Sequence, residues 1–216
     1  MPAPARRAAT VALLRDGDAG LEVFVMKRAA SMAAAPDMHV FPGGGVDAAD
    51  GAPGDPGSTQ AAARRELFEE TGVVLPEEAP LAYFARWITP EPLPHRHDTD
   101  FFAAALPSGQ EPGLVGTEAQ DCGWTAPAAA IDDALAGRIG LLPPTAAAMY
   151  QLAAFPDVAG ALDGLSREAG DPPPALMPVR GSDGWVLRDT SSGRDITDPV
   201  ELGLPPRWRP IPPGLP

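Results

Sequence analysis

The chain has 216 residues, enough for one domain with a sizeable core, and its formal net charge at pH 7 is −13. The net charge is strongly negative and Lys27 is the only lysine, so no Lys/Arg-dense patch indicates binding to a nucleic-acid backbone. The single cysteine, Cys122, excludes an intramolecular disulfide and a cysteine-based zinc site. Together with the lack of an apolar run of membrane-spanning length, this predicts a cytoplasmic protein.

The first part of the chain is predicted to form strands that lead into a glycine-rich segment. Residues 8–14 and 21–28 are apolar runs separated by a turn-rich spacer, which predicts a strand pair. Residues 31–38 are expected to form a loop. Residues 39–41 (HVF) then read as the end of a strand that delivers the chain into a glycine turn at residues 43–45.

A helix rich in Ala, Arg, Leu and Glu is predicted after this turn. Ser58 or Thr59 can cap its N-terminus, and the helical pattern extends to Thr71. Gly72 stands where a helix end favours a left-handed residue. Leu67 faces away from the acidic residues of this helix, so we expect it to pack on the sheet.

Three glutamates of this helix fall on one face. Glu66, Glu69 and Glu70 have relative spacings of 0, 3 and 4, so they span an arc of about 100°. Like charges at this spacing repel each other, and a hard divalent cation with oxygen ligands would stabilise the group. The alternative is a solvated acidic face that Arg64 and Arg65 partly neutralise.

Further strands and helices are predicted downstream. The pattern favours strands at residues 81–89, 99–106 and 121–126, a helix at residues 127–136, and one or two helices at residues 141–170. Strands before and after one helix, with more helices later, predict an α/β fold with a mixed sheet between helical layers.

The end of the chain has a different composition. Eleven prolines fall in the last 47 residues, and residues 184–196 read as a hairpin. We therefore expect residues 1–169 to form the domain. Residues 170–216 are expected to form an appended Pro-rich arm, not an independent domain, which could wrap a second subunit of a homodimer.

The glycine segment and the acidic helix resemble the signature of the Nudix hydrolases, G-x5-E-x7-R-E-U-x-E-E-x-G-U, where U is a bulky aliphatic residue. Residues 65–73 (RELFEETGV) match its second half at every specified position, and Gly44 matches its first glycine. Two departures stand out. Asp50 replaces the expected Glu, and fourteen residues separate it from Arg65 where the signature has seven. The surplus lies in the Gly/Pro-rich residues 51–58, which we interpret as a surface-loop insertion.

The resemblance implies an α/β/α Nudix sandwich that uses Mg²⁺ or Mn²⁺ to hydrolyse a nucleoside diphosphate linked to another group, X. Residues 39–50 and 85–106 resemble a Nudix subgroup that includes mammalian acyl-CoA diphosphatases. The expected substrates are therefore CoA or acyl-CoA, ADP-ribose, NADH or similar small molecules, with no nucleic-acid polymer or membrane as partner. The alternative function is a non-catalytic Nudix module that senses a nucleotide.

The resemblance also implies the metal and catalytic residues. Glu69, Glu70 and the Gly44 carbonyl are the expected metal ligands, joined by Glu66 as a ligand or as the general base. Arg65 precedes Glu69 by four residues and can hold that carboxylate. Glu118, just before a predicted strand, is a second candidate for the base.

Substrate contacts are expected from residues around this centre. Arg28 ends the second predicted strand, and Gly43 and Gly44 bring bare backbone to the site. Arg86 and Trp87 lie in the segment that resembles the acyl-CoA subgroup. Asp121 competes with Glu118 for the role of the later acidic residue.

Overall fold

The computed structural model describes residues 3–32, 35–52, 55–91, 93–168, 173–182, 184–202, 204–205 and 208. Its strands are β1 (Arg6–Gly17), β2 (Gly20–Arg28), β3 (Met38–Val40), β4 (Gly43–Gly45), β5 (Ala82–Ile88), β6 (His97–Ala105), β7 (Ala119–Thr125), β8 (Gly140–Leu141), β9 (Ala175–Gly181), β10 (Gly184–Asp189) and β11 (Asp195–Ile196). Its helices are α1 (Pro56–Thr71), α2 (Pro127–Leu135), α3 (Pro143–Leu152) and α4 (Val158–Glu168), with short 3-10 turns at Ala48–Asp50 and Pro199–Leu202.

These strands form one mixed sheet. Its order is β11-β10-β9-β5-β6-β1-β2-β3-β8, with β4 paired to β1 and β7 paired to β2. β1 runs parallel to β6 and antiparallel to β2, so the predicted strand pair and the predicted mixed sheet are both confirmed. β5 pairs antiparallel with β6 on one side and parallel with β9 on the other.

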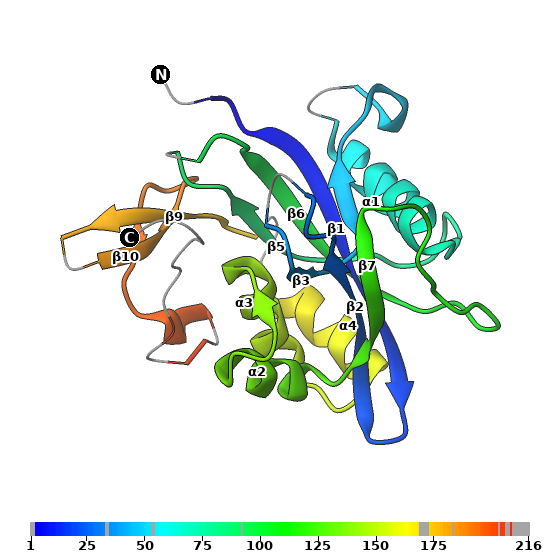
Figure 1. Cartoon of the computed structure of the whole chain (residues 1–216). Coiled ribbons are helices and arrows are strands. Elements are labelled where there is room, and N and C mark those ends of the chain that lie inside the picture. Colours follow the sequence, from blue (N-terminus) through cyan, green and yellow to red (C-terminus); the bar gives the residue numbers. More distant parts are fainter. Residues whose placement is uncertain are drawn as a thin grey trace.

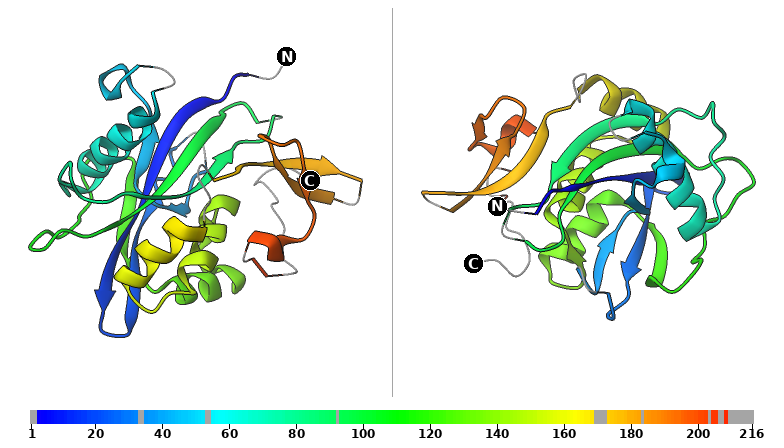
Figure 2. Two further views of the ribbon diagram at one scale, coloured as in Figure 1. Left: turned by 180° about the vertical axis from the view of Figure 1, so that it is seen from behind. Right: turned by 90° about the horizontal axis from the view of Figure 1, so that it is seen from above.

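Helices cover both faces of the sheet (Figure 1). α1 packs on β1 through Ala63 and Leu67, which are fully buried in one apolar cluster with Val11 and Leu13. α2, α3 and α4 pack on the opposite face and form a second apolar cluster. The two further views in Figure 2 show the same two layers, so the predicted α/β/α sandwich is confirmed. Within the described ranges, no helix has both the length and the apolarity needed to cross a membrane.

The acidic helix begins earlier than its sequence suggests. Asp55, not Ser58 or Thr59, is the N-cap, and its carboxylate accepts a hydrogen bond from the Gly57 N–H at 2.9 Å. Pro56 follows at the first helical position, where its fixed φ and missing N–H are tolerated. Part of the Gly/Pro-rich insertion is therefore the first turn of α1, whereas residues 53 and 54 lie outside the described residues.

The three consecutive glycines form a strand, not a turn. β4 pairs antiparallel with β1, with Gly43 opposite Thr10. A Cβ atom on Gly43 would lie 2.3 Å from the Ala9 carbonyl oxygen and 2.6 Å from the Thr10 Cα. Glycine is therefore required because the two backbones approach too closely for a side chain.

The C-terminal segment, meaning the described residues from 173 to 208, extends the sheet beyond β5 through β9, β10 and β11. β9 adds to β5 in parallel, and β10 and β11 follow antiparallel. Figure 2 shows this segment lying alongside the main sheet. Four of its apolar side chains are at most 5% exposed and belong to the same cluster as α2 to α4: Leu176, Leu187, Ile196 and Leu204. The division at residue 169 stays a prediction.

Candidate active site

Two glutamates of α1 contact the glycines of β4. The backbone N–H of Gly43 donates a hydrogen bond to Glu70 Oε2 at 2.8 Å. The Glu66 carboxylate lies against Gly44, where an added Cβ would be 2.4 Å from Glu66 Oε1. The absence of side chains at both glycines thus lets two carboxylates of one helix reach the backbone of the neighbouring strand.

Arg65 connects the Glu66 carboxylate to Asp50, Glu69 and the backbone of β4. Its Nε and Nη2 donate to the two oxygens of Asp50 at 2.9 and 2.8 Å, in a bidentate arrangement. Its Nη1 donates to Glu66 and to Glu69, each at 2.9 Å, and its Nη2 also donates to the Gly45 carbonyl at 2.9 Å. The guanidinium thereby holds β4 and α1 together at the carboxylates.

A cavity of about 810 Å³ lies next to these carboxylates. Its lining includes four of the five residues expected to contact substrate, one expected metal ligand and one candidate base: Arg28, Gly43, Gly44 and Trp87, then Glu70, then Glu118. His95, just before β6, and His97, the first residue of β6, line the same cavity. The structure therefore brings together residues that lie as much as 90 positions apart in the sequence.

Glu70 has an unusual environment in this cavity. Burial raises the pKa of its carboxyl to about 7, although the hydrogen bond from Gly43 lowers it. The negative charges of Glu66 and Glu118 raise the pKa further, and the positive charge of Arg28 opposes them. A half-buried carboxylate near two others is a setting that a bound cation would stabilise.

The chemistry of these donors fits a hard divalent cation. Glu66 and Glu70 carry carboxylate oxygens, and Gly44, which lies against Glu66, carries a backbone carbonyl; oxygens of these kinds are the ligands that Mg²⁺ prefers. Among the described residues, no three His, Cys, Asp or Glu side chains already stand together as a metal-holding group. Arg65 instead binds one oxygen of Glu66 and one of Glu69, and the Glu69 side chain is 53% exposed.

Comparison with known proteins identifies the family. The model of the NUDIX domain matches residues 4–144, which is more than half of the chain. The chain belongs to the NUDIX family. A crystal structure of a NUDIX hydrolase from Alicyclobacillus acidocaldarius is 25% identical, covers 74% of this chain and 96% of its own, and superposes with a TM-score of 0.67.

Two further Nudix comparisons cover less of this chain. A Caenorhabditis elegans relative named "Putative nudix hydrolase 7" is 27% identical over 62% of this chain. The match spans 57% of that relative's length. A structure from Listeria monocytogenes, 18% identical with a TM-score of 0.50, covers 70% of this chain and 93% of its own, and it supports the fold alone.

Asp50 stands where the Nudix signature has glutamate, and the structure gives it a partner. Its hydrogen bonds with Arg65 are the main cause that lowers the pKa of its carboxyl. Asp50 also closes a turn by accepting a hydrogen bond from the Asp47 N–H at 2.7 Å. The Asp50 to Arg65 pair thus connects the two halves of the Nudix signature in space, although the insertion separates them in sequence.

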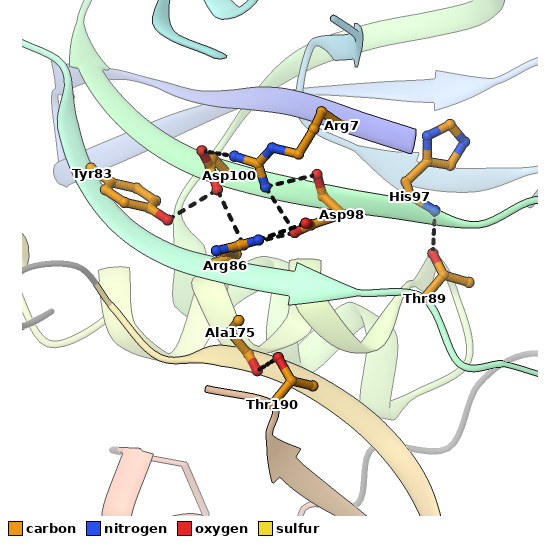
Figure 3. Close-up of polar contacts among 9 residues, drawn as sticks. All are labelled: Arg7, Tyr83, Arg86, Thr89, His97, Asp98, Asp100, Ala175 and Thr190. Carbon is orange, nitrogen blue, oxygen red and sulfur yellow. Dashed lines mark hydrogen bonds and ion pairs between the residues drawn. The ribbon is translucent and has the colours of Figure 1, made fainter. Parts of the chain in front are cut away.

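Arg86 does not join the cavity. Its guanidinium forms a bidentate ion pair with Asp98, with contacts of 2.7 and 2.6 Å. Arg7 contacts Asp98 at 2.9 Å and Asp100 at 2.5 Å, and the Tyr83 hydroxyl donates to Asp100 at 2.9 Å (Figure 3). The neighbouring Trp87 and Ile88 line the cavity instead.

Part of the cavity wall has no counterpart among the residues expected from the sequence. Leu142, Pro143 and Pro144 at the start of α3, and Pro178 of β9, all line the cavity. These residues carry no chemical signature that would mark them as binding residues in a sequence. Only the strand order, which places β9 beside β5, brings Pro178 there.

Proposed function

We propose that this Nudix protein is a metal-dependent hydrolase that cleaves the diphosphate linkage of a nucleoside diphosphate joined to a group X. The observation that supports it most directly is the packing of Glu66 and Glu70 against Gly44 and Gly43 beside the cavity. This arrangement collects oxygen donors from α1 and β4 next to a space that can hold a small substrate.

The proposed metal is Mg²⁺ or Mn²⁺, with Glu66, Glu69, Glu70 and the Gly44 carbonyl as its ligands. When bound, such an ion activates a water molecule and neutralises charge on the phosphoryl oxygens. Glu70 is held in place by the Gly43 N–H, so its orientation depends on the backbone of β4.

The proton of the attacking water requires a base, and two carboxylates are candidates. Glu66 lies against Gly44, and burial raises the pKa of its carboxyl. Glu118 is exposed and lines the cavity. Either can accept the proton, while Arg28, which lines the same cavity, can contact a phosphate oxygen. Arg65 orients Glu66 and Glu69 and has no contact with substrate in this proposal.

The substrate class is proposed from the acyl-CoA diphosphatase subgroup that residues 39–50 and 85–106 resemble. The candidates are CoA or acyl-CoA, ADP-ribose and NADH, hydrolysed in the cytoplasm, with a homodimer as the proposed assembly. Trp87, Arg28, Gly43 and Gly44 are the proposed contacts of the substrate. Arg86 is a weaker candidate, because Asp98 binds its guanidinium.

The test is release of a nucleoside monophosphate from CoA, ADP-ribose, NADH and dNTPs, with and without Mg²⁺ or Mn²⁺. Glu70→Gln should retain the fold and lower kcat by about 100-fold or more at saturating metal, because a charged ligand is lost. Glu78→Gln, on the exposed loop after α1, is the matched control. A Glu118→Gln variant with a loss as large as that of Glu66→Gln would move the base to Glu118.

Two outcomes would count against the proposal. Turnover of no substrate, combined with micromolar nucleotide binding, would favour the sensing module instead. Near-normal turnover by Glu70→Gln would show that the metal ligands are assigned wrongly.

A further inference from the structure

The cavity beside the carboxylates has two kinds of wall. Arg28, Glu70 and Glu118 provide the charged part of its lining. Another part, which we call the apolar wall, consists mainly of Trp87, Ile88, Leu93, Leu142, Pro144 and Pro178. The apolar wall lines the same cavity as the proposed metal ligand Glu70, so a single substrate can contact both.

The apolar wall offers few hydrogen-bond donors. Pro144 and Pro178 have no N–H group, and four further prolines line the rest of the cavity. Of the six side chains of the apolar wall, only the Trp87 indole carries a donor; Thr89, which also lines the cavity, accepts a hydrogen bond from the His97 N–H at 3.0 Å and keeps its own O–H. A sugar or the edge of a nucleobase would leave polar groups unpaired against this wall, which is costly.

The C-terminal segment supports this wall. Pro178 of β9 is part of it, and β9 pairs with β5 so that Leu176 lies opposite Trp87. The Trp208 ring packs edge-on against Trp87, with ring centroids 6.2 Å apart and planes at 69°. Trp87 is only 4% exposed, because the C-terminal segment and the core enclose it.

We infer that the C-terminal segment completes the substrate cavity and makes it select a group X that carries an apolar chain or ring. Trp208 acts as a positioning residue for Trp87, whereas Pro178 and Leu142 contact X directly. The inference rests on the proposed function and adds to it the chemical class of X and the residues that recognise it.

The first experiment measures kcat/KM for ADP esters whose β-phosphate carries ribose, butyl or octyl. Each methylene that the wall buries should raise kcat/KM about three- to fourfold. Burial of only two of the four additional methylenes would therefore make octyl-ADP about tenfold better than butyl-ADP. ADP-ribose should be the poorest substrate of the three.

A second measurement separates binding from turnover. The same groups are attached to methylene-bridged ADP, which cannot be hydrolysed at that linkage, and Kd is measured by calorimetry with and without Mg²⁺. The same dependence of Kd on chain length is expected, because the apolar wall acts in binding.

Leu142→Asp places a charge in the apolar wall at little expected cost to the fold, because Leu142 is the N-cap of α3 and aspartate is favoured there. It should remove most of the preference for octyl over butyl, measured as the ratio of their Kd values. Leu135→Asp, at a residue that is 76% exposed, is the matched control and should keep the preference.

Trp208→Ala should reduce the preference for octyl over butyl, measured as the ratio of their Kd values, by threefold or more. Trp208→Phe should restore most of this preference. Val200→Ala, at a 51% exposed residue of the same segment, is the control. A general loss of stability would weaken binding of all three analogues equally, whereas the inferred role changes only the dependence on chain length.

The outcomes are distinguishable. Kd values that do not depend on chain length, or an octyl preference that survives both Leu142→Asp and Trp208→Ala, would overturn the inference. Absence of hydrolysis, combined with a chain-length dependence of Kd that both variants reduce, would overturn the proposed function and leave the apolar site standing.

Discussion

Arg65 uses each of its five N–H donors within the protein. One Nε–H and two hydrogens on each terminal nitrogen are matched by hydrogen bonds to Asp50, Glu66, Glu69 and the Gly45 carbonyl. This arrangement needs a planar, branched cation. Arg65 therefore fixes the relative position of α1 and β4, and it is only 22% exposed.

Arg65→Lys tests this role. Lysine has three donors on one atom and cannot bind Asp50 in a bidentate manner while it also reaches both glutamates. We expect kcat to fall roughly 10- to 100-fold with a small change in KM, because the orientation of the carboxylates is lost. Arg64→Lys is the control, since Arg64 binds the carbonyl oxygens of Pro76, Glu77 and Ala79. Equal activity of Arg65→Lys and the unmodified protein would contradict the role.

The sequence indicated part of this centre. Spacings of 0, 3 and 4 placed the glutamates on one face of a helix, and the spacing of four predicted the contact between Arg65 and Glu69. The partnership of Asp50 with Arg65 was not predicted, because the inserted residues hide the spacing that the signature requires. Only the three-dimensional structure brings these two side chains within hydrogen-bonding distance.

At the scale of elements, three neighbouring strands share a cluster of charges. Arg7 of β1, Asp98 and Asp100 of β6, and Tyr83 and Arg86 of β5 contact one another across the sheet (Figure 3). Burial would raise the pKa of Asp98, but Arg86 and Arg7 overcome this effect and lower it. The cluster couples the strand that carries Trp87 to the central strand β1.

Stability should therefore depend on pH through Asp98. Folding lowers the pKa of Asp98, so its carboxylate stabilises the folded protein at pH values above its unfolded-state pKa of about 3.9. This stabilisation is lost as the pH falls through the pKa of Asp98 in the folded state. Asp98→Asn should lower the free energy of unfolding by about 1–2 kcal/mol at pH 7, since both arginines are partly exposed to solvent.

Urea unfolding at several pH values measures this effect. The difference between the unmodified protein and Asp98→Asn should shrink below pH 4, where the carboxylate becomes protonated. Asp18→Asn, in the exposed turn between β1 and β2, is the control. A difference that stays constant down to pH 2 would show that the charge of Asp98 is not its cause.

The elements themselves were largely predictable, and their ends were not. Alternating or continuous apolar runs identified β1, β2, β5 and β6, because burial imposes these patterns on strands. The start of α1 was misjudged because Asp55 and Pro56 lie in a Gly/Pro-rich stretch that resembles a loop. The strand β4 was missed because three glycines give no β propensity, and only the close approach of β1 explains them.

At the scale of the whole molecule, the C-terminal segment is packed into the core. Leu176, Leu187, Ile196 and Leu204 are at most 5% exposed, and β9 covers the edge of β5. The Thr190 hydroxyl also donates to the Ala175 carbonyl at 3.1 Å (Figure 3). The place of the C-terminal segment in the sheet could not be predicted from the sequence, because the pairing of two strands about 90 residues apart leaves no local sequence pattern.

A chain that ends at residue 169 tests this packing. It would expose the edge of β5 and the apolar surface around Trp87, so we expect Tm to fall by on the order of 10 °C. Exposed strand edges also promote association, so size-exclusion chromatography should show larger species. An unchanged Tm and an unchanged elution volume would mean that the segment is dispensable for the fold.

The charge of the cavity has a consequence for the rate at which substrate arrives. Glu70 and Glu118 line it on a molecule with a net charge of −13, and a nucleoside diphosphate is itself an anion. Diffusional encounter is therefore opposed by long-range repulsion, which added salt screens over a Debye length of about 10 Å at 0.1 M.

For this protein we expect kcat/KM at saturating Mg²⁺ to rise a few fold as NaCl increases from low to physiological concentration. An enzyme that attracts its anionic substrate would show the opposite trend. The effect of salt on encounter is checked directly by stopped-flow measurement of the association rate of a fluorescent, non-hydrolysable nucleotide. An association rate that falls as salt is added would mean that the local field of Arg28 outweighs the charge of the whole molecule.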